Sequence, residues 1–236
     1  AQESSSTCPS TEKQKDLGRL LLQELTDLGV DAEMDDNGYV YGLLPSNSDK
    51  EVPTIALLAH QDTSPDAPGE NVSPIIHDYE GGDIVLPGAP DMVIAVADNP
   101  HLNDLVGTQV ITSDGTTLLG ADDKAGIAEI MDAVTHLVRN PDIKHGPLQV
   151  VFTVDEEIGR GVDKLDMDRV TATAAYTFDG TTAGQMEIET FSADLAVVTC
   201  LGVNVHPGFA QDKMINAVKV AAALVDALPK DRLGPA

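Results

Sequence analysis

Two stretches of the chain place apolar residues at helical spacing. Leucines recur every three or four positions over residues 11–28, which predicts an amphipathic helix with Thr11 and Gln14 as a capping box and Gly29 at its C-terminal end. Residues 123–139 predict a second helix with one apolar face. That face consists of Ile127, Ile130, Met131, Val134, Leu137 and Val138.

Short apolar runs without polar alternation predict strands that are buried on both faces of a sheet. They cover residues 54–59, 148–154 and 174–178, and a further strand is expected at 38–44. A short helix over 163–170 is expected between the last two runs. The alternation of strands and helices predicts an α/β fold, with a mostly parallel sheet flanked by helices.

The pattern changes near residue 190. Residues 191–201 alternate loosely and predict a strand with one exposed face, and residues 212–228 predict an Ala- and Val-rich helix. We therefore expect two domains, a large α/β domain over residues 1–190 and the beginning of a smaller α+β domain over 191–236. Within the first, residues 65–108 are rich in Pro, Gly, Asn and Asp and predict an irregular excursion.

The charge balance narrows the classes of partner. The 236 residues include 39 acidic and 14 basic side chains, a net charge of −25. Nucleic acids and anionic membranes both require a basic face, so neither is an expected partner. The first ten residues lack the apolar region of a signal peptide, and no apolar run is long enough to span a membrane. With two distant cysteines, Cys8 and Cys200, these features predict a cytoplasmic protein.

Acidic side chains and one histidine stand where the predicted buried strands end and where the second helix begins. In an open parallel sheet, the ligand crevice lies outside the carboxyl ends of the strands, so these side chains are expected at one common edge. They are His60, Asp62, Asp122, Asp123, Glu156, Glu157 and Asp179.

So many carboxylates in one place repel one another unless a cation neutralises them. One imidazole with several carboxylate oxygens suits Zn²⁺, with Mn²⁺ and Co²⁺ as alternatives. We expect a pair of ions that share one carboxylate, as in other hydrolytic sites. One ion would bind His60 and Asp179, the other would bind Glu157, and Asp122 would bridge them.

Two of the three remaining acids have other expected roles. Asp62, two residues after His60, is expected to hold the second imidazole nitrogen of that histidine. Glu156 would be free to act as the general base for a metal-activated water that attacks a scissile carbonyl. The residues therefore predict a metal-dependent hydrolase.

Several motifs carry a resemblance to a known family. The chain resembles the peptidase T family, the tripeptide aminopeptidases among the dinuclear-zinc M20-type peptidases. The matching stretches are AHQDTSP (59–65), GGDI (81–84), ITSDG (111–115), LLGADDKAGIAEIM (118–131), FTVDEE (152–157) and NVHPG (204–208).

The resemblance implies the same ligand and base roles, together with two further features. Asp122 and Asp123 would be joined by a cis peptide bond. His206, in the smaller domain, would reach the active site of a partner subunit and help bind the oxyanion. The expected assembly is thus a homodimer formed through the smaller domain, and the expected substrate is a short peptide that loses its N-terminal residue.

The same resemblance implies a further metal-binding His and a substrate-binding Arg, both beyond residue 236. The chain is therefore expected to correspond to the N-terminal part of such an enzyme. Two alternatives stay open at this point. One is another M20-type enzyme, namely a carboxypeptidase, dipeptidase or deacylase. The other is a metal-binding fragment without catalytic activity.

Overall fold

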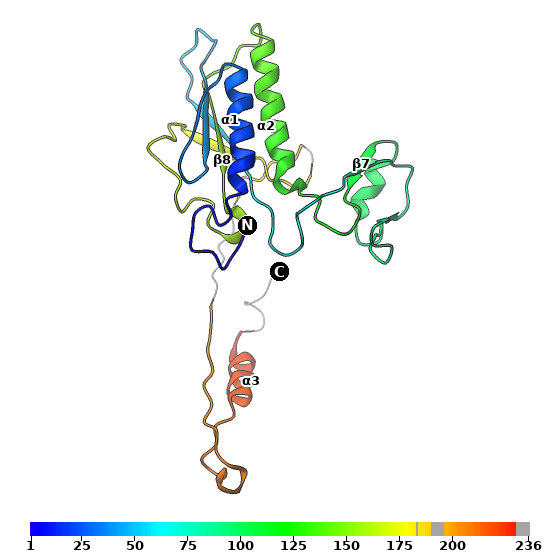
Figure 1. Ribbon diagram of the computed structural model, residues 1–236, viewed down its shortest axis with the longest axis vertical. Helices are drawn as coiled ribbons and strands as arrows, with labels where there is room; N and C mark the ends of the chain where they lie inside the picture. The colour runs from blue at the N-terminus through cyan, green and yellow to red at the C-terminus, as the bar shows by residue number, and fades with distance from the viewer. Residues whose placement is uncertain (183, 190–195, 230–236) are drawn as a thin grey trace. The chain divides into compact units, whose positions relative to one another are not determined.

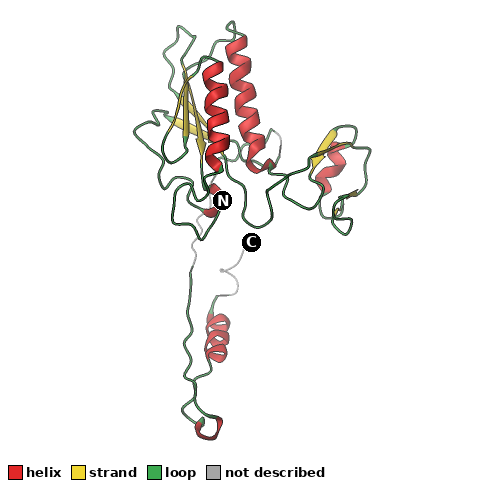
Figure 2. Ribbon diagram, viewed as in Figure 1, coloured by secondary structure: helices red, strands yellow, loops and turns green. Residues whose placement is uncertain are grey.

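The computed structural model describes residues 1–182, 184–189 and 196–229 (Figures 1 and 2). The chain divides into two compact units, Ala1–Gln185 and Met186–Ala236. The helices are α1 (Gln14–Asp27) and α2 (Ala121–Arg139) in the first unit and α3 (Ala217–Ala227) in the second. The main sheet contains β1 (Asp31–Met34), β2 (Val40–Leu44), β3 (Ile55–His60), β8 (Leu148–Thr153) and β9 (Ala174–Thr177).

The main sheet has the strand order β1-β2-β8-β3-β9. Strand β3 is parallel to both β8 and β9, whereas β1, β2 and β8 pair in antiparallel fashion. The α/β class is confirmed, but the sheet is mixed rather than mostly parallel, because β2 adds to its edge antiparallel to β8, and β1 antiparallel to β2. In the parallel part, His60 is in register with Thr153, so β3 and β8 end side by side. The polar residues that follow these two strands are therefore brought together.

The hydrophobic core lies between the two long helices and one face of the sheet. In Figure 1, α1 and α2 run side by side along the strands. Leu21 and Leu25 of α1 and Ile130 and Val134 of α2 pack in one cluster with sheet residues such as Phe152. A second cluster covers the opposite face and is built on Tyr39, Tyr41, Val151 and Val154.

Both predicted long helices are present, and their ends differ in detail from the sequence prediction. Helix α1 begins at Gln14 rather than residue 11, and no side chain caps its first turn. The capping box is absent because the side chain of Gln14 is bonded to Asp155 instead. Its Nε2 donates to the carboxylate of Asp155, and its Oε1 accepts from the N–H of Asp155. Gly29 follows the helix with a φ of 79°, as expected of a C-terminal glycine. The predicted buried face of α2 is confirmed, since its residues belong to the core.

Two predictions between β8 and the second unit are wrong. Residues 163–170 form successive turns instead of a helix. The carboxylate of Asp166 accepts from the N–H of Asp168 and from Arg169 Nε, which gives the chain a local alternative to helical hydrogen bonds. Strand β9 is exposed at every residue rather than buried, because it lies at the edge of the sheet.

The region between β3 and α2 contains more regular structure than its composition predicts. Strand β4 (Ile75–Asp78) pairs with β7 (Gln109–Thr112), and β5 (Ile84–Val85) pairs with β6 (Val93–Ile94). A 3₁₀ helix, η1, covers Pro100–Leu105. The region has its own small core, made of Tyr79, Ile84, Leu86 and Leu102.

In the second unit, α3 begins at Ala217 and not at residue 212. The boundary is set by Asn216, whose side chain accepts from the N–H groups of Val218 and Lys219. Part of the strand predicted over 191–201 lies outside the described residues, and 196–201 form no strand. No helix in the described parts of the chain combines the length and the apolar character needed to cross a membrane.

Candidate active site

The site is built around His60, the last residue of β3, whose exposed fraction is only 2%. Its backbone N–H donates to Asp123 Oδ2 over 3.1 Å. Its ring Nδ1 lies 3.2 Å from the carbonyl oxygen of Asp62 and 3.4 Å from Asp62 Oδ1. Nε2 points the other way, 2.8 Å from Asp122 Oδ1. One nitrogen of the ring is thus held by Asp62, and the other faces the acids of α2.

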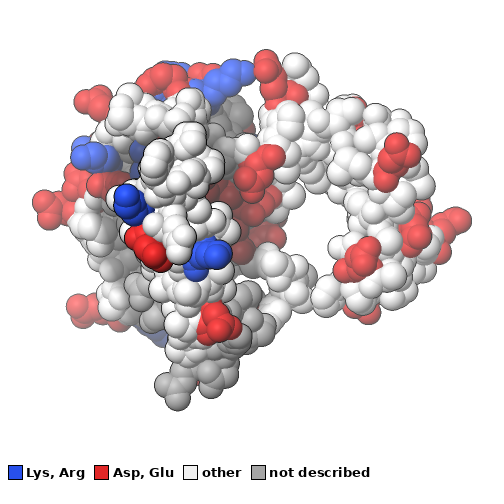
Figure 3. Space-filling view, turned by 90° about the horizontal axis from the view of Figure 1, so that it is seen from below, with Lys and Arg blue, Asp and Glu red and all other residues white. Residues whose placement is uncertain are grey.

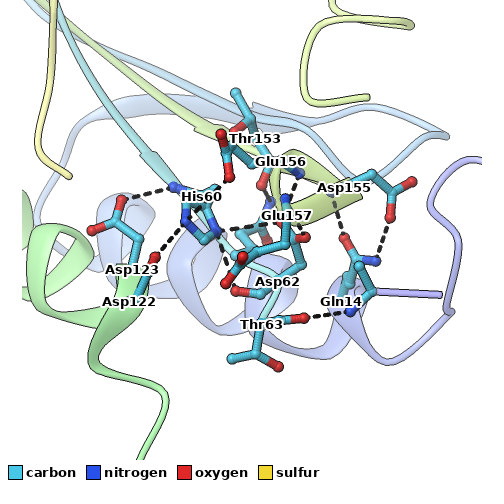
Figure 4. A network of polar contacts seen from close by, with 12 residues as sticks. Gln14, His60, Asp62, Thr63, Asp122, Asp123, Thr153, Asp155, Glu156 and Glu157 are labelled. Carbon is cyan, nitrogen blue, oxygen red and sulfur yellow. Dashed lines mark hydrogen bonds and ion pairs between the residues drawn. The ribbon is translucent and has the colours of Figure 1, made fainter. Parts of the chain in front are cut away.

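Two further carboxylates approach the same Nε2 atom. Glu156 Oε2 lies 3.8 Å away and Asp179 Oδ2 lies 3.9 Å away. Asp179 comes two residues after β9, and Glu156 begins the 3₁₀ helix η2 (Glu156–Ile158) after β8. Three chain segments therefore bring their acids to the end of β3, as Figure 4 shows for those from α2 and η2.

Asp62 is buried and fixes the turn that carries the two glutamates. Its Oδ1 accepts from the N–H of Glu156 over 3.0 Å, and its Oδ2 accepts from the N–H of Glu157 over 3.1 Å. Burial opposes the ionised form of Asp62. The hydrogen bond to His60 and the two N–H groups outweigh it, so that the pKa of Asp62 is lowered. The carboxylate of Asp62 thus links His60 to the start of η2.

Asp122 and Asp123 are joined by a cis peptide bond, as the resemblance implies. Both residues depart from helical φ/ψ, and their side chains go in different directions. Asp122 is largely exposed, with 68% of its side chain accessible, and reaches Nε2 of His60. Asp123 is buried and accepts from the N–H groups of His60 and Gly126. Burial and the charge of Asp179 raise the pKa of Asp123 to about 6.

Crowding of like charges marks the open side of the site. The pKa of Glu156 is raised by partial burial and by Asp179, Asp62 and Glu157. The pKa of Asp179 is raised by partial burial and by Asp122, and that of Glu157 by partial burial, Asp122 and Asp62. Burial opposes the charged form of His60. The hydrogen bonds to Asp62 and Asp122 and the negative charges of Asp62 and Asp123 outweigh the effect of burial, and they raise the pKa of His60 to about 9.

The donor set fits a divalent metal ion. Ligand atoms of His60, Asp122 and Asp179 all lie within 4.8 Å of one another. An imidazole nitrogen with carboxylate oxygens is a ligand combination that Zn²⁺ accepts. A cation there would also relieve the repulsion that, together with partial burial, raises the pKa values of Asp179 and the glutamates.

The structure brings together six of the seven residues proposed for the site, five of them around His60. Glu157 lies on the same turn as Glu156, and its carboxylate senses the charge of Asp122. His206 belongs to the second unit, where its Nδ1 accepts from the N–H of Gly208. Its role stays a prediction. The residues with proposed roles are His60, Asp62, Asp122, Glu156, Glu157, Asp179 and His206.

Sequence reasoning assigned no role to three buried polar residues of the site. Asp123 holds the backbone of His60. Gln61 is 3% exposed and donates to the carbonyls of Gly38, Phe152 and Thr153. Asp155 is fully buried behind Glu156. The available signal was their position, since each is adjacent in sequence to a proposed site residue.

Comparison with known proteins points to one family of peptidases. A family model described as "Peptidase dimerisation domain" matches residues 188–235. Peptidase T of Geobacillus thermodenitrificans is 52% identical over 95% of this chain and 55% of its own length. Peptidase T of Bacillus subtilis is 52% identical over 97% of this chain and 56% of its own. The chain belongs to the peptidase T family.

A solved structure gives the same result. The crystal structure of aminopeptidase PepT from Bacillus cereus matches with a TM-score of 0.62 and 28% sequence identity. The match covers 95% of this chain and 53% of that one. The chain thus spans about half the length of the peptidase T relatives it matches.

Proposed function

We propose that this chain carries the metal site and the general base of an aminopeptidase that releases the N-terminal residue from tripeptides. The observation that carries the proposal is the convergence of one imidazole and three carboxylates at the end of β3, with Nε2 of His60 within 3.9 Å of all three. Membership of the peptidase T family supports the reaction class.

In the proposed reaction, His60, Asp122 and Asp179 would hold one divalent ion, and Asp122 and Glu157 would hold a second. Such ions, when bound, lower the pKa of a water molecule and polarise the scissile carbonyl. Asp62 keeps Nδ1 of His60 engaged, which leaves Nε2 to face the ion. Glu156 takes a proton from the attacking water and passes it to the leaving amine. Its raised pKa favours this exchange.

The charge of the chain supports a preference for the amino end of a peptide. No Lys or Arg lies between Lys50 and Lys124, a segment that includes the first half of the site. In Figure 3, Asp and Glu side chains outnumber the Lys and Arg side chains that are visible. Such a field attracts an α-ammonium group and disfavours a free carboxylate. An aminopeptidase is thus favoured over a carboxypeptidase.

The second unit supports a homodimer, because residues 188–235 match a peptidase dimerisation domain. We propose that the dimer forms through this unit and that His206 reaches the active site of the partner subunit, where it helps bind the oxyanion. Zinc is the proposed metal, with Mn²⁺ and Co²⁺ as alternatives, and the cytoplasm is the proposed compartment. The metal and compartment rest on the sequence arguments above.

The test compares the chain with its Glu156→Gln variant, which removes the base and keeps the side-chain volume. Metal content is measured together with hydrolysis of a tripeptide, its N-acetylated form and its C-terminal amide. We expect the unmodified chain to cleave the free tripeptide and the amide but not the acetylated peptide. The variant should bind the same amount of metal and lose about 100- to 10,000-fold in kcat.

Each other outcome selects a different reading. Cleavage of the acetylated peptide and not of the amide would indicate a carboxypeptidase. Metal binding by both proteins without any hydrolysis would indicate the metal-binding alternative for these 236 residues. Full activity of Glu156→Gln would remove Glu156 as the base.

A further inference from the structure

Asp155 directly precedes the proposed base and is turned away from the metal ligands. Its exposed fraction is 0%. Its carboxylate accepts from the N–H of Ser10 over 2.7 Å, from the hydroxyl of Ser10, and from Nε2 of Gln14 over 2.7 Å. Its own N–H donates to Oε1 of Gln14 over 3.1 Å. Asp155 thus links the end of β8 to Ser10, which precedes α1, and to Gln14, the first residue of α1.

The backbone at Asp155 divides the chain between two sets of partners. Its φ of 57° is in the left-handed region, which non-glycine residues seldom occupy and which Asp and Asn tolerate better than most. Beyond it, the N–H groups of Glu156 and Glu157 turn to Asp62. In Figure 4, Asp155 lies with Gln14 on one side of the turn, while Asp62 lies on the side of His60.

The position of Glu156 depends on this backbone. About half of its side chain is exposed, and its nearest charged partner, Nε2 of His60, is 3.8 Å away. No hydrogen bond of the described residues holds its carboxylate. The location of Glu156 is therefore set by the turn. Asp62 binds this turn on the side of His60, and Asp155 binds it to Ser10 and Gln14 on the other side.

We propose that Asp155 is a positioning residue, through which residues 10–14 support the turn that carries the proposed general base. The support itself is a property of the fold. Its catalytic consequence rests on the proposed role of Glu156. Nothing in the proposed reaction uses Asp155, Ser10 or Gln14 directly, and their mutual hydrogen bonds are buried.

The test begins with hydrogen exchange on the metal-free full chain, followed on the fragment that covers residues 153–160. Asp155→Asn keeps the side-chain volume, and asparagine also tolerates a left-handed backbone. The new N–H₂ group, however, faces the donors of Ser10 and Gln14, which then lose an acceptor. We expect exchange at Glu156 and Glu157 to accelerate at least tenfold. Asp163→Asn, the same change at an exposed acid eight residues later, should leave exchange there unchanged.

A stability control separates support from general weakening. Val134→Ala removes two methyl groups from the core side of α2, away from the turn. It should accelerate exchange throughout the first unit. A uniform acceleration of that kind in Asp155→Asn, or no acceleration at all, would overturn the proposal. If Asp155→Asn fails to fold, Ser10→Ala, which removes only the hydroxyl donor, should show a smaller acceleration at the same two amides.

Kinetics then test the consequence for catalysis. In the metal-loaded chain we expect Asp155→Asn to lower kcat at least tenfold while KM and metal content stay within twofold. An unchanged kcat together with faster local exchange would remove the positioning role. Absence of turnover in every protein, the unsubstituted chain included, would count against the proposed function, and the exchange result would still decide whether Asp155 supports the turn.

Discussion

The buried and the exposed acids of the site differ in what they bind. The inner group, Asp62, Asp123 and Asp155, is at most 2% exposed, and each member accepts backbone N–H groups. The outer group consists of Asp122, Glu156 and Asp179, which lie around Nε2 of His60, and Glu157, which follows Glu156 on the same turn. The inner acids fix the chain segments, and the outer acids are available to ligands. Substitutions in the two groups should therefore affect different properties.

The largest expected effect on stability comes from Gly126, where the two groups meet. A Cβ at this position would lie 1.9 Å from the carbonyl oxygen of Phe178 and 2.5 Å from Asp123 Oδ1. Alanine normally favours a helix, but here β9 or α2 must shift. We expect Gly126→Ala to cost about 3 kcal/mol or more of unfolding free energy in urea and to displace Asp179, which follows Phe178.

The control for Gly126 is Glu129→Ala, at an exposed position of the same helix. It should change the free energy of unfolding by less than about 0.5 kcal/mol. If Gly126→Ala is as stable as the unsubstituted chain and binds metal equally well, then α2 and the end of β9 are not in the close contact described above.

The pH dependence of the metal-free protein tests the inner group through His60. Its folded pKa of about 9 exceeds the unperturbed 6.5, so the folded state binds this proton more tightly than the unfolded state. The resulting stability is fully present below pH 6.5 and is lost as the pH rises towards 9. The loss should be about 3 kcal/mol, measured as urea unfolding free energy in the presence of a chelator.

His60→Gln supplies the comparison for this pH profile. The variant should be less stable at pH 6 and should lose the slope between pH 6.5 and 9. A wild-type profile that is flat over this range would show that Asp62 and Asp122 do not hold a protonated His60.

A paired substitution separates the two groups most directly. Asp62→Asn replaces an inner acid whose lowered pKa reports a favourable charge, and it should cost about 2 kcal/mol at pH 7.5 because a partly buried N–H group loses its acceptor. Asp179→Asn removes an outer acid whose pKa is raised by partial burial and by repulsion from Asp122. It should leave the metal-free stability unchanged or higher.

Zinc titration by calorimetry completes the comparison. We expect Asp179→Asn to weaken zinc binding at least tenfold, because loss of a ligand should cost about 1.4 kcal/mol or more of binding free energy. Equal losses of stability in both variants would mean that burial does not divide the site into two groups.

The outer group could be predicted from the sequence, and the inner group only in part. Motifs and strand ends located Asp122, Glu156 and Asp179, because chemistry restricts which residue types hold a metal. In the pairs Asp122-Asp123 and Asp155-Glu156, however, one acid faces the open site and the other is buried. The backbone differs from the ordinary in both pairs, with a cis peptide bond in one and a left-handed residue in the other. Neither can be read from residue type alone.

The fold shows the same division. Buried apolar runs correctly indicated β3 and β8, which have neighbours on both sides. The run at β9 looks alike in sequence, but the strand lies at an edge and is exposed. The hydrophobic pattern indicates that a segment can form a buried strand. Whether the strand is buried depends on its neighbours in the tertiary structure.

The smallest expected effect concerns Gly18, where α1 approaches the residue between His60 and Asp62. A Cβ on Gly18 would lie 2.8 Å from Gln61 Oε1 and 2.9 Å from Met34 Sδ. The preference of a helix for alanine, about 1 kcal/mol, should thus be offset, and Gly18→Ala should cost about 1 kcal/mol net. A double-mutant cycle with Gln61→Ala isolates the cause, because the shorter side chain removes that contact. In the Gln61→Ala background, Gly18→Ala should be neutral or stabilising, and an equal cost in both backgrounds would place the strain at Met34 instead.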